Sequence, residues 1–197
     1  MARSEVAPNP SAGFDLITKL TLAASIGLLL ARFGTAEQIG FGDAEALYVV
    51  YGLFGQPSYL DHPGFIGWIC RAIAEQNGVP SPTVVHRFTA IAATSIPWIA
   101  GLAARAGGAS WRGSMLAILG LTILPELAIG LYAFTPDLPL AFFWTSAIAL
   151  ALVALRENPK SNRALAATLG VGICVGLATI SKISGVLLGI AMIVTWL

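Results

Sequence analysis

The sequence predicts an all-α integral membrane protein, a bundle of several membrane-spanning helices. Hydrophobic residues make up 56% of the 197 positions and the mean hydropathy is +0.79. Charged residues make up only 11%, where a soluble domain has about 25%. This composition excludes an ordinary soluble domain, and it excludes a disordered chain, which combines low hydrophobicity with high charge.

Two further counts exclude other classes of protein. The formal net charge of +1 provides no basic surface, so no nucleic-acid partner is expected. The two cysteines, Cys70 and Cys174, lie in different kinds of segment. They are interpreted as small packing residues and not as a disulfide framework.

Runs of about 20 apolar residues locate the expected spans. The first, 14–33, follows a tail at 1–13 that we expect to be cytoplasmic. It is interpreted as a retained signal anchor, because no clear small-residue cleavage site follows it. The other expected spans are 88–104, 114–134, 138–155, 164–181 and 183–197. Because the last run is still apolar at Leu197, we expect the N-terminal part of a longer transmembrane domain, truncated at its C-terminus.

Loop charges orient this bundle. The loops at 105–112 and 156–163 are rich in Arg and Lys, so the positive-inside rule predicts that both are cytoplasmic. The long loop at 34–82, the turn at 135–137 and Lys182 then lie on the outer side. All the acidic residues considered below as catalytic groups fall on that side.

The outer loop contains two short apolar stretches, 44–54 and 65–74, which carry Tyr and Trp side chains. They are too short to span a bilayer. Aromatic rings of this kind are favoured at the membrane–water interface, so we expect two short interfacial helices.

Polar groups in apolar surroundings are costly and often functional. Asp43 and Glu45 follow the first span, and their i, i+2 spacing puts them on different helix faces. For Asp43, a catalytic base or metal ligand competes with a helix N-cap. For Glu45, the alternative is a carboxylate that faces water or pairs with a base.

Other polar positions also have two interpretations. Asp61 and His62 could bind a cation, a phosphate or a sugar, or could belong to a turn. Asp137 could be catalytic or an N-cap of the fourth span. Lys182 and Arg87 could hold a phosphate or could snorkel to the interface.

Glu126 lies inside the third expected span. Along a continuous helix it would lie about 16 Å from Asp137. We expect Glu126 to be paired with a buried partner or protonated, and assign it no catalytic role.

These motifs occur in an order that resembles the N-terminal half of GT-C-fold glycosyltransferases, in particular bacterial relatives of protein O-mannosyltransferases and lipid A aminoarabinose transferases. The matching segments are 43–48 for a D-E-A-x-Y-like motif, 59–64 for Y-x-D-H-P-P, Arg87 at the start of a span, 135–140 for T-P-D-x-P-L and 176–182 for G-L-A-x-L-S-K. The resemblance therefore covers the chain from about Phe41 onward.

The resemblance implies an inverting transfer of a sugar from a polyprenyl-phosphate donor to a hydroxyl or phosphate of a lipid, glycan or protein acceptor. The reaction would occur at the outer face of the lipid bilayer, on the periplasmic side of a bacterial inner (plasma) membrane. Asp43, as base, and Asp137 would be catalytic. The implied substrate contacts are Glu45, Tyr48, Tyr59, Asp61, His62, Arg87 and Lys182. A divalent cation bound by Asp43 and Asp137 stays open, and no nucleotide cofactor is expected.

The chain departs from the family pattern in two places. Ala44 separates two acids that are adjacent in many relatives, which leaves open which is the base; Asp43 is favoured. Gly64 replaces a second proline and is expected to loosen the turn without changing the chemistry.

Two other functions compete with the enzyme. A secondary transporter would have ionisable groups near the membrane midplane and inverted repeats, whereas here the groups cluster at one side and no repeat is found. A non-catalytic scaffold would have no reason to collect these acids on one side.

Overall fold

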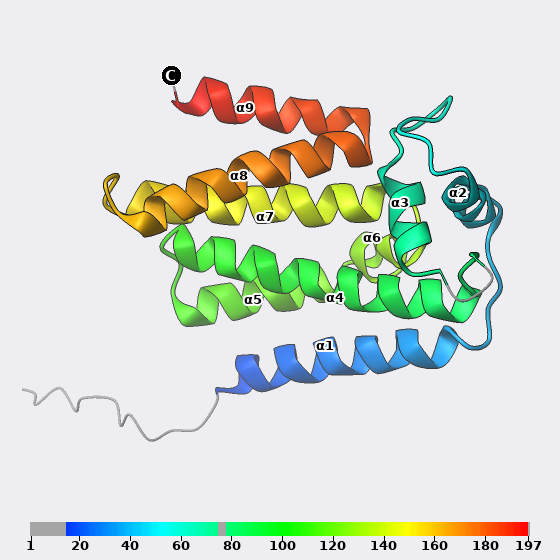
Figure 1. The fold of residues 1–197 in the computed structure, drawn as a ribbon. Helices are drawn as coiled ribbons and strands as arrows, with labels where there is room; N and C mark the ends of the chain where they lie inside the picture. The colour runs from blue at the N-terminus through cyan, green and yellow to red at the C-terminus, as the bar shows by residue number, and fades with distance from the viewer. Residues whose placement is uncertain (1–14, 75–77, 197) are drawn as a thin grey trace, which may run out of the picture.

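The computed structural model describes residues 15–74 and 78–196, and within these ranges the protein is helical without a strand. Its long helices run side by side as a bundle (Figure 1). They are α1 (Leu16–Thr35), α4 (Pro82–Ala106), α5 (Trp111–Ile123), α7 (Asp137–Arg156), α8 (Asn162–Ser181) and α9 (Val186–Trp196). The tail expected at 1–13 lies outside the described residues.

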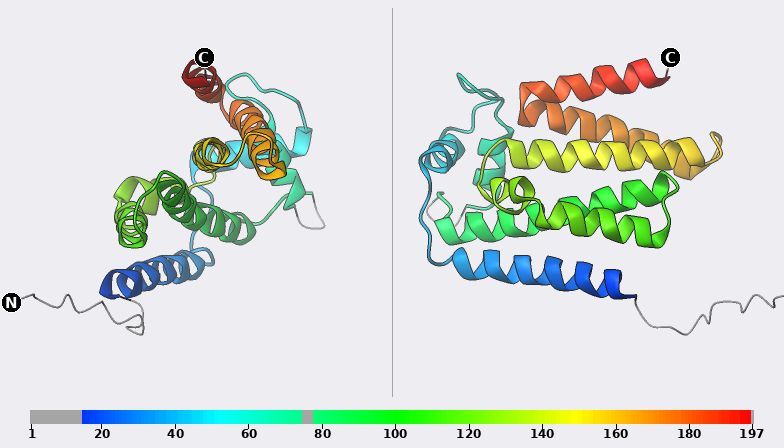
Figure 2. Two further views of the ribbon diagram at one scale, coloured as in Figure 1. Left: turned by 90° about the vertical axis from the view of Figure 1, so that its left-hand side faces the viewer. Right: turned by 180° about the vertical axis from the view of Figure 1, so that it is seen from behind.

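Two short helices, α2 (Asp43–Phe54) and α3 (Phe65–Ala72), lie across one end of the bundle (Figures 1 and 2). They confirm the two short helices expected in the outer loop. Gly55 ends α2 in the left-handed conformation (φ 58°), which glycine adopts without steric cost.

The bundle separates the acidic segments from the basic loops. The connections from α4 to α5 and from α7 to α8 lie at one end (Figure 1). The opposite end carries α2, α3, the start of α7 and the end of α8. The alternation of charge along the sequence therefore corresponds to two opposite ends of the molecule.

Among the described residues, three helices, α1, α7 and α8, are long and apolar enough to cross a membrane. Helix α5 and the segment Pro125–Tyr132 form a bent pair, which is a fourth candidate span if the two parts count as one. Helix α9 is apolar but shorter, and α4 does not reach the same hydropathy. The six expected spans therefore stay a prediction, although a helix begins near each of them.

One face of α1 buries polar side chains, namely Thr18, Thr21, Ser25 and Arg32. These side chains bond to neighbouring helices: the Thr21 hydroxyl lies 3.1 Å from the Met115 carbonyl oxygen, and the Trp98 indole N–H donates to the Ser25 hydroxyl at 3.2 Å. In a bilayer, helices associate through small and polar side chains because lipid is as apolar as leucine. The polar face of α1 therefore faces protein, whereas Leu16, Leu20 and Leu30 of the same helix are exposed.

The third expected span, 114–134, is wrong as a continuous helix. Helix α5 ends at Ile123, and Leu124 is extended (ψ 121°). The chain then bends by 68° into the short helix α6 (Pro125–Ala128) and the 3₁₀ turn η1 (Gly130–Tyr132). The cause is Pro125, since a proline disfavours the helical conformation of the residue before it and lacks an N–H.

Arg32 holds this broken segment. Its guanidinium donates to the carbonyl oxygens of Leu127 and Ala128, both at 2.8 Å, and to the Thr94 hydroxyl at 2.7 Å. The side chain is 4% exposed. The Tyr132 hydroxyl donates back to the Arg32 carbonyl oxygen at 2.8 Å. A single cation of α1 thus satisfies carbonyl groups that α6 is too short to satisfy.

We predict that Arg32→Lys destabilises the protein by about 2–3 kcal/mol, because an ammonium cannot reproduce the planar fork that reaches three acceptors at once. The free energy of unfolding, measured by denaturant titration in mixed micelles, checks this. Arg163→Lys is the matched control, since the Arg163 side chain is 85% exposed. Equal stability of the two variants would contradict the role given to Arg32.

Candidate functional site

Asp137 and Lys182, far apart in the sequence, meet in an ion pair. The Lys182 ammonium donates to Asp137 Oδ1 at 2.6 Å. Asp137 is the first residue of α7, and Lys182 directly follows α8, so the packing of α7 against α8 brings the two together. Both side chains keep part of their surface exposed, which leaves the pair accessible to a ligand.

Neither Asp43 nor Asp137 caps its helix, so the capping alternative is wrong for both. The N-caps are Gly42 and Pro136, and each aspartate is the first helical residue. The Asp43 side chain is exposed. Within the described part of the chain it makes no hydrogen bond or ion pair, so its carboxylate is accessible at the surface, and its catalytic role stays a prediction.

Glu45 has a different environment, because its carboxylate is buried and occupied. It accepts hydrogen bonds from the backbone N–H of Gly42 at 2.9 Å and of Phe134 at 2.8 Å. His86 Nε2 lies 3.1 Å from the same carboxylate, and the His86 side chain is 1% exposed. Glu45 therefore joins α2, α4 and the turn before α7. Its contact with substrate stays a prediction, and the contacts seen here are structural.

Asp61 is held by Tyr51, whose hydroxyl donates to Asp61 Oδ1 at 2.5 Å. This hydrogen bond raises the pKa of Tyr51 to about 12 and lowers the pKa of Asp61. The Tyr59 ring stacks on the Tyr51 ring, with centroids 3.8 Å apart, and the Tyr59 hydroxyl donates to the Tyr51 carbonyl oxygen. Tyr59 thus supports the loop through its hydroxyl, and its predicted substrate contact is untested.

Tyr48 lies within electrostatic reach of both the loop and α7. Burial raises the pKa of Tyr48, and the negative charges of Asp61 and Asp137 raise it further. The His62 ring lies 5.6 Å from the Tyr48 ring, and His62 Nε2 is 3.8 Å from Asp61 Oδ2. Four residues that the sequence predicted as site residues therefore gather at one end of the bundle: Tyr48, Asp61, His62 and Asp137.

Arg87, near the start of α4, forms an ion pair with Glu37 in the segment after α1. Both side chains are about half exposed. A phosphate at Arg87 would have to share the guanidinium with Glu37, and this contact stays a prediction.

The expectation that Gly64 loosens the turn is wrong. The Gly64 N–H donates to the Pro57 carbonyl oxygen at 2.9 Å, a bond that proline could not make. A Cβ at position 64 would lie 2.2 Å from the Gln56 carbonyl oxygen. Glycine therefore tightens this loop, because only glycine lets the two backbone segments approach so closely.

The described residues contain no group of three or more His, Cys, Asp or Glu side chains placed to hold a metal ion. A divalent cation at Asp43 and Asp137 accordingly stays a prediction.

Two hollows flank the first turns of α7. One, of about 410 Å³, lies among α3, α4 and α7, and its lining is apolar and aromatic, including Phe65, Phe88, Leu138, Phe142 and Phe143. The other, of about 390 Å³, lies between α7 and the broken segment and is bordered by Asp137 and Glu126.

The position of Glu126 corrects the sequence-based expectation. Its side chain is exposed and makes no hydrogen bond or ion pair within the described residues, whereas pairing with a buried partner was one of the two expected alternatives. The other alternative, a protonated carboxyl, stays a prediction. The bend at Pro125 places Glu126 on the same hollow as Asp137, where a continuous helix would have separated them.

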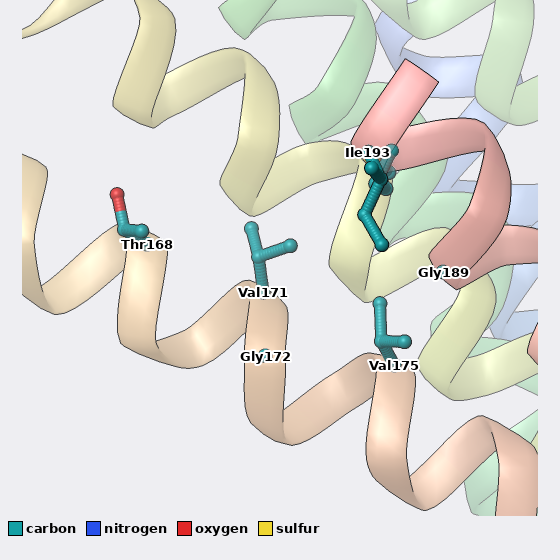
Figure 3. A pocket seen from close by; sticks show the side chains of 7 residues that line it. Thr168, Val171, Gly172, Val175, Gly189 and Ile193 are labelled. Carbon is teal, nitrogen blue, oxygen red and sulfur yellow. The ribbon is translucent and has the colours of Figure 1, made fainter. Parts of the chain in front are cut away.

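A third hollow lies between α8 and α9 (Figure 3). Its lining is Thr168, Val171, Gly172, Val175, Gly189, Met192 and Ile193. The hydroxyl of Thr168 donates to the Ala164 carbonyl oxygen at 2.9 Å, so this lining offers no titratable group and little polarity for chemistry.

Sequence reasoning missed three residues that shape the site. Tyr51 follows Tyr48 by one helical turn, and that spacing could have indicated a shared face. His86 is one of only two histidines and adjoins Arg87. Arg32 lies near the end of the first apolar run, and no local pattern indicates its role because its carbonyl partners, Leu127 and Ala128, are far away in the sequence.

The chain is similar to known proteins in sequence and in fold. A family model described as dolichyl-phosphate-mannose-protein mannosyltransferase matches residues 61–197. In fold, the chain is similar to the S. cerevisiae protein O-mannosyltransferase Pmt1-Pmt2 complex bound to the sugar donor, with a TM-score of 0.73 and 15% sequence identity. That match covers 93% of this chain and 28% of the yeast chain. No curated protein matches. The likeness confirms the predicted all-helical membrane bundle of GT-C type.

We predict that Gly64→Ala destabilises the 56–64 loop and that Gly64→Pro does so more strongly, since proline adds the loss of a hydrogen bond to the steric clash. Hydrogen exchange of the loop amides measures this. Gly120→Ala is the control, because a Cβ there meets nothing within 4 Å. Unchanged loop protection in Gly64→Pro would contradict the close-approach argument.

Proposed function

The chain belongs to the dolichyl-phosphate-mannose-protein mannosyltransferase family, and from this premise we propose that it acts as a membrane glycosyltransferase. It transfers a sugar from a polyprenyl-phosphate donor to an acceptor hydroxyl, with inversion at the anomeric carbon. The observation that carries the proposal is the Asp137–Lys182 ion pair beside an apolar hollow, at the same end as the free carboxylate of Asp43.

The donor has two parts with opposite solubility. Its phosphate needs a cation, and the Lys182 ammonium has three N–H donors, of which one is directed to Asp137. The other donors are available to stabilise the phosphate as it leaves. The apolar hollow begins at Leu138, next to Asp137, and its aromatic lining suits a hydrocarbon chain.

The acceptor needs a base. Asp43 takes the hydroxyl proton while the acceptor oxygen attacks the anomeric carbon, and the bond from that carbon to the phosphate oxygen breaks. The polyprenyl phosphate leaves with the bonding electron pair, and Lys182 neutralises its charge. Asp43 and Asp137 are the proposed ligands if a divalent cation takes part, since carboxylate oxygens suit hard cations. No nucleotide cofactor is proposed.

Asp61, His62 and Tyr48 are proposed to orient the acceptor, a lipid, glycan or protein. The Tyr51 hydrogen bond supports this role for Asp61, because it fixes one carboxylate oxygen and leaves the other available. We propose that the end with these residues faces the periplasmic side of a bacterial inner membrane, since the basic loops lie at the opposite end.

A secondary transporter is the alternative function. Transporters bind their substrates near the bilayer midplane, commonly between broken helices. The bend at Pro125 is such a break, yet the Asp137–Lys182 pair lies at the ends of α7 and α8 and not at their middles. The polar residues therefore favour chemistry at the membrane surface.

We predict that Asp43→Asn in the intact protein abolishes transfer from labelled polyprenyl-phosphate sugars without unfolding the protein, because the amide cannot accept the proton. Transfer of label in membrane vesicles measures this. Glu157→Gln, in the opposite loop, is the matched control. Near-normal turnover of Asp43→Asn would exclude Asp43 as the base.

We predict that Lys182→Ala weakens donor binding by about tenfold or more, since it removes a charge-assisted hydrogen bond to the phosphate. Equilibrium binding of labelled donor to protein in nanodiscs measures the affinity. Lys160→Ala, exposed in the opposite loop, is the control. A donor affinity equal to that of the control would remove the phosphate role from Lys182.

A further inference from the structure

The hollow between α7 and the broken segment has the size and lining of a small-molecule site. Its volume of about 390 Å³ falls in the range of about 300–1,000 Å³ typical of such sites. Its walls include Glu126, Leu127 and Leu131 from the broken segment, and Asp137, Trp144 and Thr145 from α7. It therefore joins an aromatic face, apolar walls and two carboxylates beside the proposed phosphate-binding lysine.

Two polar groups of this hollow have no partner in the described part of the chain. The Glu126 carboxylate is exposed and makes no hydrogen bond or ion pair there. The other tryptophans with described side chains, Trp68, Trp98 and Trp111, donate their indole N–H to the protein. Trp144 makes no such bond within the described residues. The hollow thus offers an unused acceptor, an unused donor and an aromatic ring.

The charge of the hollow restricts what it can hold. Asp137 and Glu126 are the two carboxylates that line the hollow, and Lys182 balances the charge of Asp137. The formal charge of the hollow is therefore −1, from Glu126. A second anion would be repelled at this short range. A neutral ring with several hydroxyls fits, because carboxylates accept hydrogen bonds from hydroxyls and an indole packs against the C–H face of a ring.

We propose that this hollow is a sugar subsite, in which Glu126 accepts hydrogen bonds from ring hydroxyls and Trp144 supplies the stacking face and an N–H donor. The inference rests on the proposed glycosyl transfer, and it adds Glu126 and Trp144 as specificity-determining residues. The ring is neutral and hydroxylated, whether it is the sugar of the donor or a sugar of the acceptor.

The backbone keeps room for this role of Glu126. The bend at Pro125 turns the residue toward Asp137, and Arg32 holds the bent segment through the Leu127 and Ala128 carbonyl groups. A Cβ at Gly130 would lie 3.2 Å from Glu126 Oε1 and would crowd the carboxylate. Glycine at 130 therefore leaves the carboxylate its space.

Binding of methyl α-D-mannopyranoside to the intact protein in nanodiscs tests the subsite without requiring transfer. Saturation-transfer NMR gives the affinity for the wild type, Glu126→Gln, Trp144→Ala and the control Glu157→Gln. We expect Kd to rise about tenfold in the first two variants and to stay constant in the control. Trp144→Phe keeps an aromatic ring but removes the N–H, so its Kd for the mannoside should lie between those of the wild type and Trp144→Ala. Methyl β-D-glucuronide, the anionic probe, should bind more weakly than the mannoside. Because Glu126→Gln removes the negative charge that repels the glucuronide, the Kd values of the two probes should lie closer together in this variant.

Competition then identifies the source of the sugar. Displacement of the mannoside by polyprenyl-phosphate mannose would assign the subsite to the donor, and its retention would assign it to the acceptor. No mannoside binding by the wild type, or equal affinity in Glu126→Gln and Trp144→Ala, would overturn the proposal. Binding that depends on Glu126 in a protein without transfer activity would overturn the proposed function and leave the sugar subsite standing.

Discussion

The site depends on how the irregular segment from 124 to 136 is held inside the bundle. A break in a membrane helix frees backbone groups that lipid cannot satisfy. Two buried charged side chains supply what this segment lacks: Arg32 donates to the carbonyl groups of Leu127 and Ala128, and Glu45 accepts from the N–H of Phe134. One lies on α1 and the other on α2, so the first part of the chain fixes the approach to α7.

This constraint explains why an ion pair and two hollows lie together at the start of α7. The segment delivers Asp137 at the first position of the helix, where the packing of α8 brings Lys182 beside it. The first turns of α7 then separate two hollows of different character, one apolar and aromatic and one bordered by carboxylates. A lipid-linked sugar, the donor class proposed above, has the same two characters in one molecule.

The sequence predicted the fold class, the two short helices and the separation of the basic loops from the acidic segments, which lie at opposite ends of the bundle, because these follow from composition, run length and local charge. It did not predict the break at Pro125, since the apolar run continues through the proline and hydropathy alone does not register the missing N–H. It also missed the bonds of Arg32 and Glu45, which join segments far apart in sequence. The sequence also predicted that Gly64 loosens its loop, whereas the structure shows that it tightens the loop. Glycine is required because the Gln56 carbonyl oxygen lies so close to it, and this approach depends on the folded backbone.

The same packing bears on which of the two acids after the first span is the base. Successive residues of an α-helix are rotated by about 100°, so Asp43 and Glu45, separated by Ala44, differ by about 200°. The orientation of α2 that inserts Glu45 between Phe134 and His86 therefore turns Asp43 outward. Adjacent acids would differ by only about 100° and could share one exposed site. The intervening alanine thus places the two carboxylates in different surroundings: Glu45 holds α2 against the turn before α7, and Asp43 stays exposed at the surface, as the base proposed above would have to be.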